Sequence, residues 1–440
     1  MAAKILYFEA LYTGEEFISP ARVELDNEGV IISISSSTAH AMDDEKIPGL
    51  ALPGFQNAHS HAFQYAMAGM AEGCAGNDLS DSFWSWRQHM YRIALSISPD
   101  DLRAIATMLY AEMLRQGYTH VAEFHYLHHD KKGRPYPNQA EMSHCLIEAA
   151  DQAGIDLTLV PMYYNRGGFG EEAGKDQRRF LSSDTDDYFL LLEGVEKYLL
   201  NYPSFSMGCG VHSLRSASAS DIEKIIQYNT TKKPFHIHIS EQQKEVEDCL
   251  RYHGTRPVDF LFDKFEVGSN FHLVHATHCT DEELKKISSS GAHVVLCPST
   301  EANLGDGIFP LKKFIALGGH WSIGTDSHVG LNFWEELRIL DYGQRLVSHN
   351  RKSFVGNGKE SGGIYALKES MTSGGRAMGK TEVGLQVGLP FNAVIIDTQD
   401  ALMESASSKN KIALLESIQV HVVIKNEEGF DYYKNIITAI

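Results

Sequence analysis

Phe235-His236-Ile237-His238-Ile239-Ser240-Glu241 alternates apolar side chains with histidines and then ends in a hydroxyl and a carboxylate. In an extended strand, successive side chains point to opposite faces. The three apolar residues therefore share one face, whereas His236, His238 and Ser240 share the other. This stretch predicts a buried strand with chemically active residues at its carboxyl end.

The same pattern, a short apolar run followed at once by polar residues, recurs seven more times between residues 49 and 328. The eight runs are 51–53, 120–122, 157–160, 207–211, 235–239, 271–274, 293–296 and 321–324. Eight strands of this kind with helices between them predict an α/β fold, the (β/α)8 barrel. In that fold the catalytic groups lie at the carboxyl ends of the strands, where the polar residues of this sequence occur.

Helical patterns separate the runs. After Ser98-Pro99, apolar residues recur at helical spacing from Leu102 to Met113, and a second stripe at 142–149 is closed by Gly154. Ser220-Asp221-Ile222-Glu223 and Thr280-Asp281-Glu282-Glu283 have the capping-box pattern, so we expect a helix to begin at each.

The two ends of the chain carry further strand-like runs outside the barrel pattern. They lie at 5–8, 22–25 and 30–34 near the start, and at 393–396 and 419–424 near the end. We expect both ends to pair into one small β domain beside the barrel; the alternative is two independent caps. The predicted division is a first part of the β domain at 1–52, the barrel at 53–385 and the second part of the β domain at 386–440.

Composition restricts the class of protein. The 440 residues carry 39 Lys and Arg against 57 Asp and Glu, and this net charge of −18 argues against nucleic acid and anionic membranes as partners. No apolar run approaches the length of a membrane-spanning helix, and the first residues lack the layout of a signal peptide. The six cysteines form no C-x-x-C pair, so we expect a cytoplasmic protein in a reducing compartment.

Histidines are the most informative residues, because the chain has 21 of them and several crowd at strand ends. In His59-Ser60-His61 both imidazoles point the same way in an extended segment and can converge on one ion. His238 and Asp326, at the ends of the fifth and eighth runs, would face the same mouth. Three imidazoles and one carboxylate suit a catalytic zinc ion better than magnesium or calcium. Taken singly, rim histidines and a helix-capping Asp326 are the plainer explanations.

Two further residues suit proton transfer beside a metal-bound water. His275 ends the sixth run, and Glu241 lies three residues after His238. An imidazole and a carboxylate in such positions can move protons during hydrolysis. The alternative for Glu241 is that it only begins a helix whose acidic face is solvated.

The motifs together resemble the amidohydrolase superfamily, whose first metal motif matches residues 53–61. Within it, the sequence is similar to the family of N-formimino-L-glutamate iminohydrolases, also called formimidoylglutamate deiminases. The matching stretches are 59–64, 81–87, 123–130, 212–215, 236–242, 273–278, 299–307 and 326–329. The metal motifs alone indicate only the superfamily, whereas the whole set is specific for this family.

The resemblance implies a zinc-dependent enzyme of histidine degradation that converts N-formimino-L-glutamate to N-formyl-L-glutamate and ammonia. A metal-activated hydroxide would attack the formimino carbon, with one Zn²⁺ per chain held by His59, His61, His238 and Asp326. His275, Glu241 and Asp326 are implied as the catalytic proton-transfer groups. The residues implied to hold the glutamate portion are Gln64, Arg87, Tyr126, His212 and Arg215. The resemblance also implies a homodimer. The sequence departs from the family pattern at Tyr65, where arginine is usual, in the bulkier stretch 330–334, and before 393.

Three other hypotheses compete with this one. Residues 374–381 satisfy the P-loop pattern G-x-x-x-x-G-K-[ST], but the residues upstream are helical and Gly384, Gly388 and Pro390 prevent a long helix downstream, so an NTPase is disfavoured. A related zinc deaminase acting on another amidine, a guanidine or an aminopurine is the nearer alternative, although two arginines favour a flexible dicarboxylate. The hypothesis of a catalytically inactive barrel that serves only in binding is disfavoured, because none of the expected metal ligands is missing from the sequence.

Overall fold

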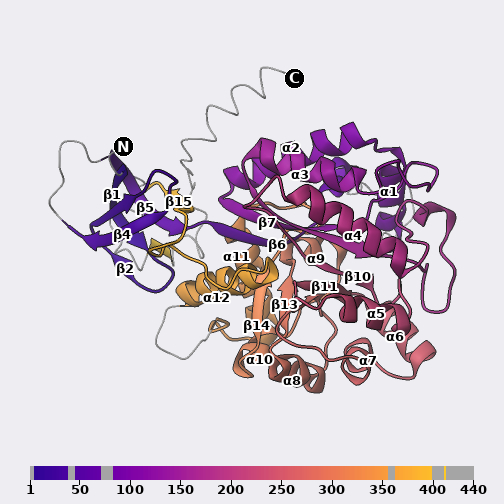
Figure 1. Ribbon diagram of the computed structural model, residues 1–440. Coiled ribbons are helices and arrows are strands. Elements are labelled where there is room, and N and C mark those ends of the chain that lie inside the picture. The colour runs from indigo at the N-terminus through magenta and orange to yellow at the C-terminus, as the bar shows by residue number, and fades with distance from the viewer. Residues whose placement is uncertain (1–3, 38–44, 71–82, 355–361, 399–410, 413–440) are drawn as a thin grey trace.

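The computed structural model describes residues 4–37, 45–70, 83–354, 362–398 and 411–412 (Figure 1). Two bodies are visible, a small β sheet that contains the N-terminal strands and a larger α/β body. Within the described ranges, no helix combines the length and the apolar character that crossing a membrane requires.

The larger body is built around eight parallel strands. In chain order these are β6 (Phe55–Ser60), β7 (Tyr118–His125), β8 (Asp156–Tyr163), β10 (Cys209–Ser213), β11 (Phe235–Ile239), β12 (Phe271–His275), β13 (His293–Leu296) and β14 (His320–Ile323). Each pairs with its neighbour in this order, and the short β9 (Ser206–Met207) pairs with β8. The backbone nitrogens of Thr325 and Asp326 both donate to the carbonyl of His59 at 3.0 Å, which nearly closes the sheet. The predicted (β/α)8 barrel is confirmed.

Helices surround the barrel. They are α1 (Phe83–Ser96), α2 (Pro99–Arg115), α3 (Glu141–Ala153), α4 (Thr185–Leu199), α5 (Ala219–Tyr228), α6 (Gln243–His253), α7 (Pro257–Lys264), α8 (Asp281–Ser290), α9 (Pro298–Leu304), α10 (Leu311–Ala316), α11 (Phe333–Ser348) and α12 (Gly362–Ala377). Short 3₁₀ helices cover Ala62–Met67 and Lys175–Gln177.

The local capping signals explain where several helices begin and end. Ser98 and Thr280 cap α2 and α8 with complete capping boxes, and Gly154 ends α3 in the left-handed conformation, as predicted. The prediction for α5 was wrong by two residues, because the cap is Ser218 with Asp221 as its partner. Ser220 has a similar local sequence, but its hydroxyl bonds Ser218 instead.

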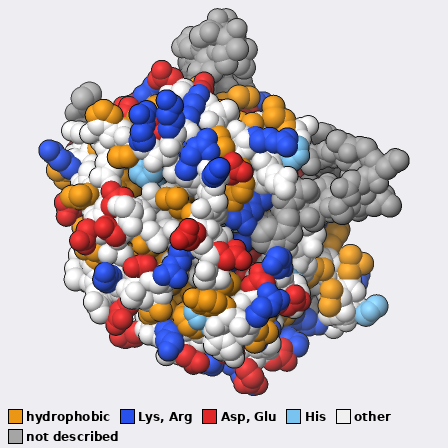
Figure 2. Space-filling model, turned by 90° about the vertical axis from the view of Figure 1, so that its right-hand side faces the viewer, with side chains coloured by type: hydrophobic (Ala, Val, Ile, Leu, Met, Phe, Trp, Pro, Cys, Tyr) orange, Lys and Arg blue, Asp and Glu red, His pale blue; other side chains and the backbone are white. Residues whose placement is uncertain are grey.

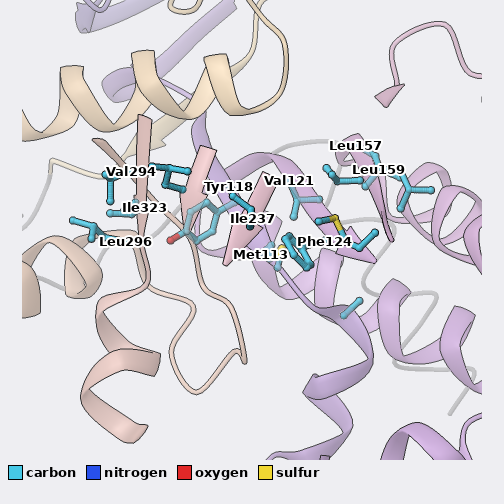
Figure 3. Packing of buried hydrophobic residues seen from close by; sticks show 14 of the residues in the cluster. Met113, Tyr118, Val121, Phe124, Leu157, Leu159, Ile237, Val294, Leu296 and Ile323 are labelled. Atoms are coloured by element: carbon cyan, nitrogen blue, oxygen red, sulfur yellow. The ribbon is translucent and has the colours of Figure 1, made fainter. Parts of the chain in front are cut away.

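Alternation along the strands separates the hydrophobic core from the polar interior of the barrel. Phe235, Ile237 and Ile239 of β11 are fully buried in apolar surroundings. Figure 3 shows the same cluster continuing through Val121, Leu159 and residues of the other strands. Burying a side chain of this size stabilises the fold by about 1.5–3 kcal/mol. The cluster therefore fixes the strands rigidly enough to hold a precise site at their ends.

The small sheet brings together segments that are far apart in the sequence. Its order is β15-β5-β1-β3-β4, with β2 beside β1. The strands are β1 (Lys4–Tyr12), β2 (Phe17–Ile18), β3 (Ala21–Leu25), β4 (Ile31–Ser36), β5 (Glu45–Pro53) and β15 (Ala393–Ile396). β15 runs antiparallel to β5, beside which it lies in Figure 1. The predicted strand at 419–424 lies outside the described residues, and the domain limits 1–52, 53–385 and 386–440 stay a prediction.

One strand assignment from the sequence was wrong. Residues 51–53 do not begin the barrel; they end β5 of the small sheet, and the first barrel strand is β6. Gly54 separates the two strands, at a point where a Cβ atom would collide with Thr119 and Asn392. β6 has the sequence Phe55-Gln56-Asn57-Ala58-His59-Ser60, which is mostly polar, so the apolar run that precedes it was taken for the first barrel strand.

The P-loop pattern has no P-loop structure. Helix α12 ends at Ala377, so Gly374 lies inside the last turns of a helix instead of in a loop that precedes one. A phosphate-cradling loop needs the positive amino end of the following helix. The arrangement agrees with the rejection of an NTPase.

Candidate active site

Four metal-type ligands meet at the carboxyl ends of β6, β11 and β14. His59 lies within β6 and His61 directly follows it, His238 lies within β11, and Asp326 follows β14. All four side chains are buried. The structure thus places the four predicted metal ligands together, although they come from three distant parts of the chain.

The donor atoms converge on one point. His59 Nε2 lies 3.1 Å from the Nε2 atoms of both His61 and His238. Asp326 Oδ1 lies 3.3 Å from His61 Nε2 and 3.6 Å from His59 Nε2. Ligands around a tetrahedral zinc ion are separated by about 3.4 Å when the zinc–ligand bonds are about 2.1 Å long. The observed separations fit such a set.

Hydrogen bonds on the far side of the imidazoles fix their orientation. His61 Nδ1 donates to the carbonyl of Phe124 at 2.8 Å, and His238 Nδ1 donates to that of His212 at 3.0 Å. A carbonyl oxygen only accepts, so the proton sits on Nδ1 and the lone pair on Nε2. Both lone pairs therefore point at His59 Nε2, and a metal ion between the three nitrogens would satisfy all of them.

The protonation states also suit a metal. Burial lowers the pKa of His59 to about 3 and lowers the pKa of His61 and His238 as well, so all three imidazoles are neutral. Burial opposes ionisation of Asp326, but its contacts with His59 and His61 hold the pKa of this carboxyl below its usual value. Neutral imidazoles and an ionised carboxylate are the forms that bind metal.

His275 lies beside this cluster at the end of β12. Its Nε2 atom is 3.8 Å from both Glu241 Oε1 and Asp326 Oδ2, and its Nδ1 atom is 3.2 Å from Glu301 Oε1. Burial alone would lower the pKa of His275, but the carboxylates of Glu241 and Glu301 outweigh burial and raise it to about 10. His275 is therefore held as an imidazolium among carboxylates.

Glu241 is buried and faces His275, so it does not belong to the solvated acidic face of α6. Burial raises the pKa of Glu241, and the nearby His275 opposes that rise. A buried carboxyl group with a raised pKa beside an imidazolium is an arrangement typical of acid–base catalysis.

Backbone strain is concentrated at the same rim. Among the described non-glycine residues with positive φ, Ser240, His275, Ala276, Asp326 and His328 all lie at or just after the ends of β11, β12 and β14. Residues other than glycine rarely adopt a positive φ. Such a backbone conformation persists where the surrounding structure enforces it, most often at functional sites. His275 and Asp326, two of the strained residues, both contribute side chains to the site.

A cavity opens above the cluster, and the five predicted substrate-binding residues line it together with His275 and Glu241. Its walls are formed by His61, Gln64, Trp86, Arg87, Met90, Tyr91, Tyr126, Tyr164, Phe180, His212, Arg215, His238, Glu241, His275, Leu304 and Asp326. His59 lies beneath the cavity and is fully buried.

Two arginines give the cavity a local positive charge. Arg87 Nε donates to the hydroxyl of Tyr91 at 2.5 Å, which orients the guanidinium group in the cavity wall. Arg215 also lines the cavity, and its Nε atom is buried without a hydrogen-bond partner among the described residues. Gln64 Nε2 donates to the Tyr126 hydroxyl at 3.0 Å, which orients both side chains. The outer face seen in Figure 2 carries basic and acidic side chains side by side.

Sequence reasoning missed part of the site. Trp86, Met90, Tyr91, Tyr164, Phe180 and Leu304 line the cavity, and Glu301 contacts His275. Tyr91 is one helical turn after Arg87, and Glu301 lies in the polar cluster after the seventh run, so both carried a weak positional signal. Trp86 and Leu304 lie within the matching stretches 81–87 and 299–307, but nothing there assigned them a role, whereas Met90 and Phe180 look like ordinary core residues.

Comparison with known proteins agrees with the geometry. The sequence pattern of the Amidohydrolase family matches residues 50–427. Formimidoylglutamate deiminase of Pseudomonas aeruginosa is 42% identical over 402 residues, which cover 91% of this chain and 88% of that protein. A 5-methylthioadenosine/S-adenosylhomocysteine deaminase of Pyrococcus furiosus is 25% identical over 350 residues, 77% of this chain and 74% of that protein.

Solved structures share the whole architecture. An amidohydrolase of Brucella melitensis superposes with a TM-score of 0.89 at 36% identity, over 99% of both chains. A zinc-bound adenosine deaminase of Xanthomonas campestris superposes with a TM-score of 0.77 at 19% identity, also over 99% of both chains, and shows the fold alone. The family pattern, the deiminase relative and the clustered ligands agree: the chain belongs to the amidohydrolase family.

Proposed function

We propose that the chain is a zinc-dependent deiminase of histidine degradation that hydrolyses N-formimino-L-glutamate to N-formyl-L-glutamate and ammonia. The observation that carries the proposal is the pair Arg87 and Arg215 in a cavity directly above a cluster of three histidines and one aspartate. The substrate has two carboxylates, and guanidinium groups bind carboxylates through paired hydrogen bonds. The name of the 42% identical relative supports the same substrate.

The metal in the proposal is a single Zn²⁺ held by His59, His61, His238 and Asp326. A zinc ion bound there supplies a water whose pKa is lowered toward about 7. Asp326 would bind the ion through one oxygen, and its second oxygen, Oδ2, lies 3.8 Å from His275 Nε2, where it could hold a proton during the reaction.

Glu241 and His275 are the proposed proton carriers for the departing nitrogen. Both line the cavity, and His275 Nε2 lies 3.8 Å from Glu241 Oε1, so a small shift brings them into hydrogen-bonding distance. Because the two groups interact strongly, their protons belong to the pair and not to either residue alone. Glu301 contacts Nδ1 on the opposite edge of the His275 ring and so keeps Nε2 directed at the cavity.

The remaining proposed residues hold the glutamate portion. Arg87 and Arg215 would each take a carboxylate, while Gln64, Tyr126 and His212 add polar contacts along the wall between them. The homodimer, the cytoplasmic location and the domain limits stay predictions.

A related zinc deaminase acting on an aminopurine, another amidine or a guanidine is the second candidate, and one observation favours the aminopurine. Trp86, Tyr126, Tyr164 and Phe180 line the cavity with aromatic rings, which stack well on a purine. A neutral purine would bring no carboxylate to the guanidinium groups of Arg87 and Arg215, which bind carboxylates through paired hydrogen bonds. The dicarboxylate therefore fits better.

Ammonia release separates these candidates. The purified chain, with its metal content measured on the same sample, is assayed with N-formimino-L-glutamate and with a panel of simpler amidines, guanidines and aminopurines. The proposal expects the highest kcat/KM for N-formimino-L-glutamate. A higher value for an aminopurine would favour the second candidate, and no ammonia from any compound by metal-loaded protein would contradict both.

A further inference from the structure

A second cavity, of about 520 Å³, opens at the opposite end of the barrel from the candidate active site. Its lining includes residues at the amino ends of β11 to β14, together with the last turns of α12 and the segment that follows them. Cavities of this volume hold small molecules of nucleotide size. Neither the proposed reaction nor the metal ligands involve it.

The lining is polar and cationic. Lys232, Arg376 and Lys380 contribute three positive charges, and none of the described lining residues is acidic, although acids outnumber bases by 57 to 39 in the chain. Lys380 Nζ lies 3.3 Å from Asp156 Oδ2, whereas Lys232 and Arg376 have no carboxylate partner in the described part of the chain. The nearby Glu369 is occupied by Ser373, His320 and the backbone of Trp321.

A row of four histidines crosses the barrel strands here, and two of them, His293 and His320, line the cavity. His236, His272, His293 and His320 occupy the same register on β11 to β14, with ring centroids 4.9, 5.1 and 5.2 Å apart in that order. His293 lines the cavity, is 94% buried and has an Nδ1 atom without a hydrogen-bond partner among the described residues. Burial lowers the pKa of His293 to about 4, so its imidazole is neutral, whereas the hydrogen bond with Glu369 raises the pKa of His320.

The lining has the composition of a phosphate site. Besides the three cations, Ser269, Thr372, Ser373 and Thr381 bring hydroxyl groups to it. Arginine and lysine bind phosphate through charge-assisted hydrogen bonds, which hydroxyl groups supplement. Among the described lining residues only Pro234 has a wholly apolar side chain, so most side chains of the lining can offer a polar contact.

We propose that this cavity binds a phosphate-bearing small molecule. The end of the P-loop pattern, Gly379-Lys380-Thr381, lines this cavity. It would bind phosphate in a different way from a P-loop. The segment follows the carboxyl end of α12, whose partial negative charge opposes an anion, so side-chain cations must supply the attraction. The site therefore binds without the backbone cradle of an NTPase, and hydrolysis of the bound phosphate is not expected.

The test uses the full chain and calorimetric titration with three probes: inorganic phosphate, pyrophosphate and ATP. We expect saturable binding of at least one probe at one site per chain, with a dissociation constant below about 1 mM. Phosphate or pyrophosphate alone would identify a free-phosphate site, and tighter binding of ATP a nucleotide site. Failure of all three probes to saturate would overturn the proposal.

Matched variants locate the binding. The double variant Lys232→Ala, Arg376→Ala should bind the probe at least about 10-fold more weakly, because each substitution removes one charged contact with the phosphate. Lys131→Ala with Arg351→Ala, which removes two exposed cations elsewhere, should leave it unchanged. Equal affinities of the two double variants, both with the wild-type melting temperature, would contradict the proposal. So would loss of binding after removal of metal, because the probe would then sit at the metal ligands.

Discussion

His275 Nδ1 lies 3.2 Å from Glu301 Oε1, and the same carboxylate oxygen accepts a hydrogen bond from the backbone nitrogen of Cys297 at 2.9 Å. The contact fixes the ring of His275, whose opposite nitrogen faces Glu241 and Asp326. The Cys297 thiol is nearby, but burial raises its pKa well above the usual value, so it stays protonated. Glu301 thus acts on the site through His275.

Replacing Glu301 by alanine should lower kcat by about 10- to 100-fold, a loss typical of outer-shell partners, with a smaller change in KM and full metal content. Glu301→Gln, which keeps one oxygen for the Cys297 nitrogen, should retain more activity. Steady-state kinetics and metal analysis of both variants check this. If the double variant His275→Ala, Glu301→Ala is much slower than His275→Ala alone, Glu301 does not act through His275.

Arg87 and Arg215, which we call the arginine clamp, are proposed to bind the two substrate carboxylates, so replacing either should lower kcat/KM. Arg215→Ala should lower kcat/KM for N-formimino-L-glutamate by a factor on the order of 10–100, because a charged hydrogen bond contributes about 1.5–3 kcal/mol. Arg87→Lys keeps the charge but loses the paired geometry, so its loss should be intermediate. Unchanged kinetics in Arg215→Ala would remove this residue from the clamp.

The proposed ligand set predicts that two histidines of β11, His238 and His236, differ in their effect on zinc content. His238→Ala should lose most of its bound zinc, since one of four donor atoms is removed. His236→Gln should keep it, because the ring of His236 points to the carbonyl of Ala377 in the layer below. Elemental analysis after dialysis checks both variants. Full zinc content in His238→Ala would exclude this residue as a ligand.

The barrel and the ligand cluster could be predicted because their signals are local. Strand ends carry His59, His238 and Asp326 in short motifs, and the barrel rule then brings them to one mouth. Features that depend on how distant segments pack together could not be recognised in the sequence. The assignment of 51–53 failed because two consecutive strands belong to different sheets, and Phe180 reads as a core residue until its neighbours are known.

Glu336 gives a prediction about stability and pH. It is buried and accepts hydrogen bonds from Ser299 N at 2.8 Å and Ser299 Oγ at 2.5 Å. Burial, which the Ser299 hydrogen bonds oppose, raises its pKa from 4.5 to about 8. The native state therefore holds a proton that the unfolded state releases, so its contribution to stability is full below pH 4.5 and is lost as the pH rises through 8.

Glu336→Gln should remove this dependence, because the amide mimics the protonated acid and can accept from Ser299 N. Between about pH 6 and about pH 9, the melting temperature of the wild type should fall more than that of the variant. Thermal unfolding followed by circular dichroism measures both. Parallel falls in the two proteins would mean that Glu336 is already ionised in the native state.

The most direct measurement follows the product of N-formimino-L-glutamate with metal-free and zinc-restored protein. Mass spectrometry identifies the product, and an ammonia assay gives the stoichiometry. We expect equal amounts of N-formyl-L-glutamate and ammonia from the zinc-restored chain and almost none from the metal-free chain. Turnover that survives complete removal of metal, or no turnover by the zinc-restored chain, would contradict the proposed function.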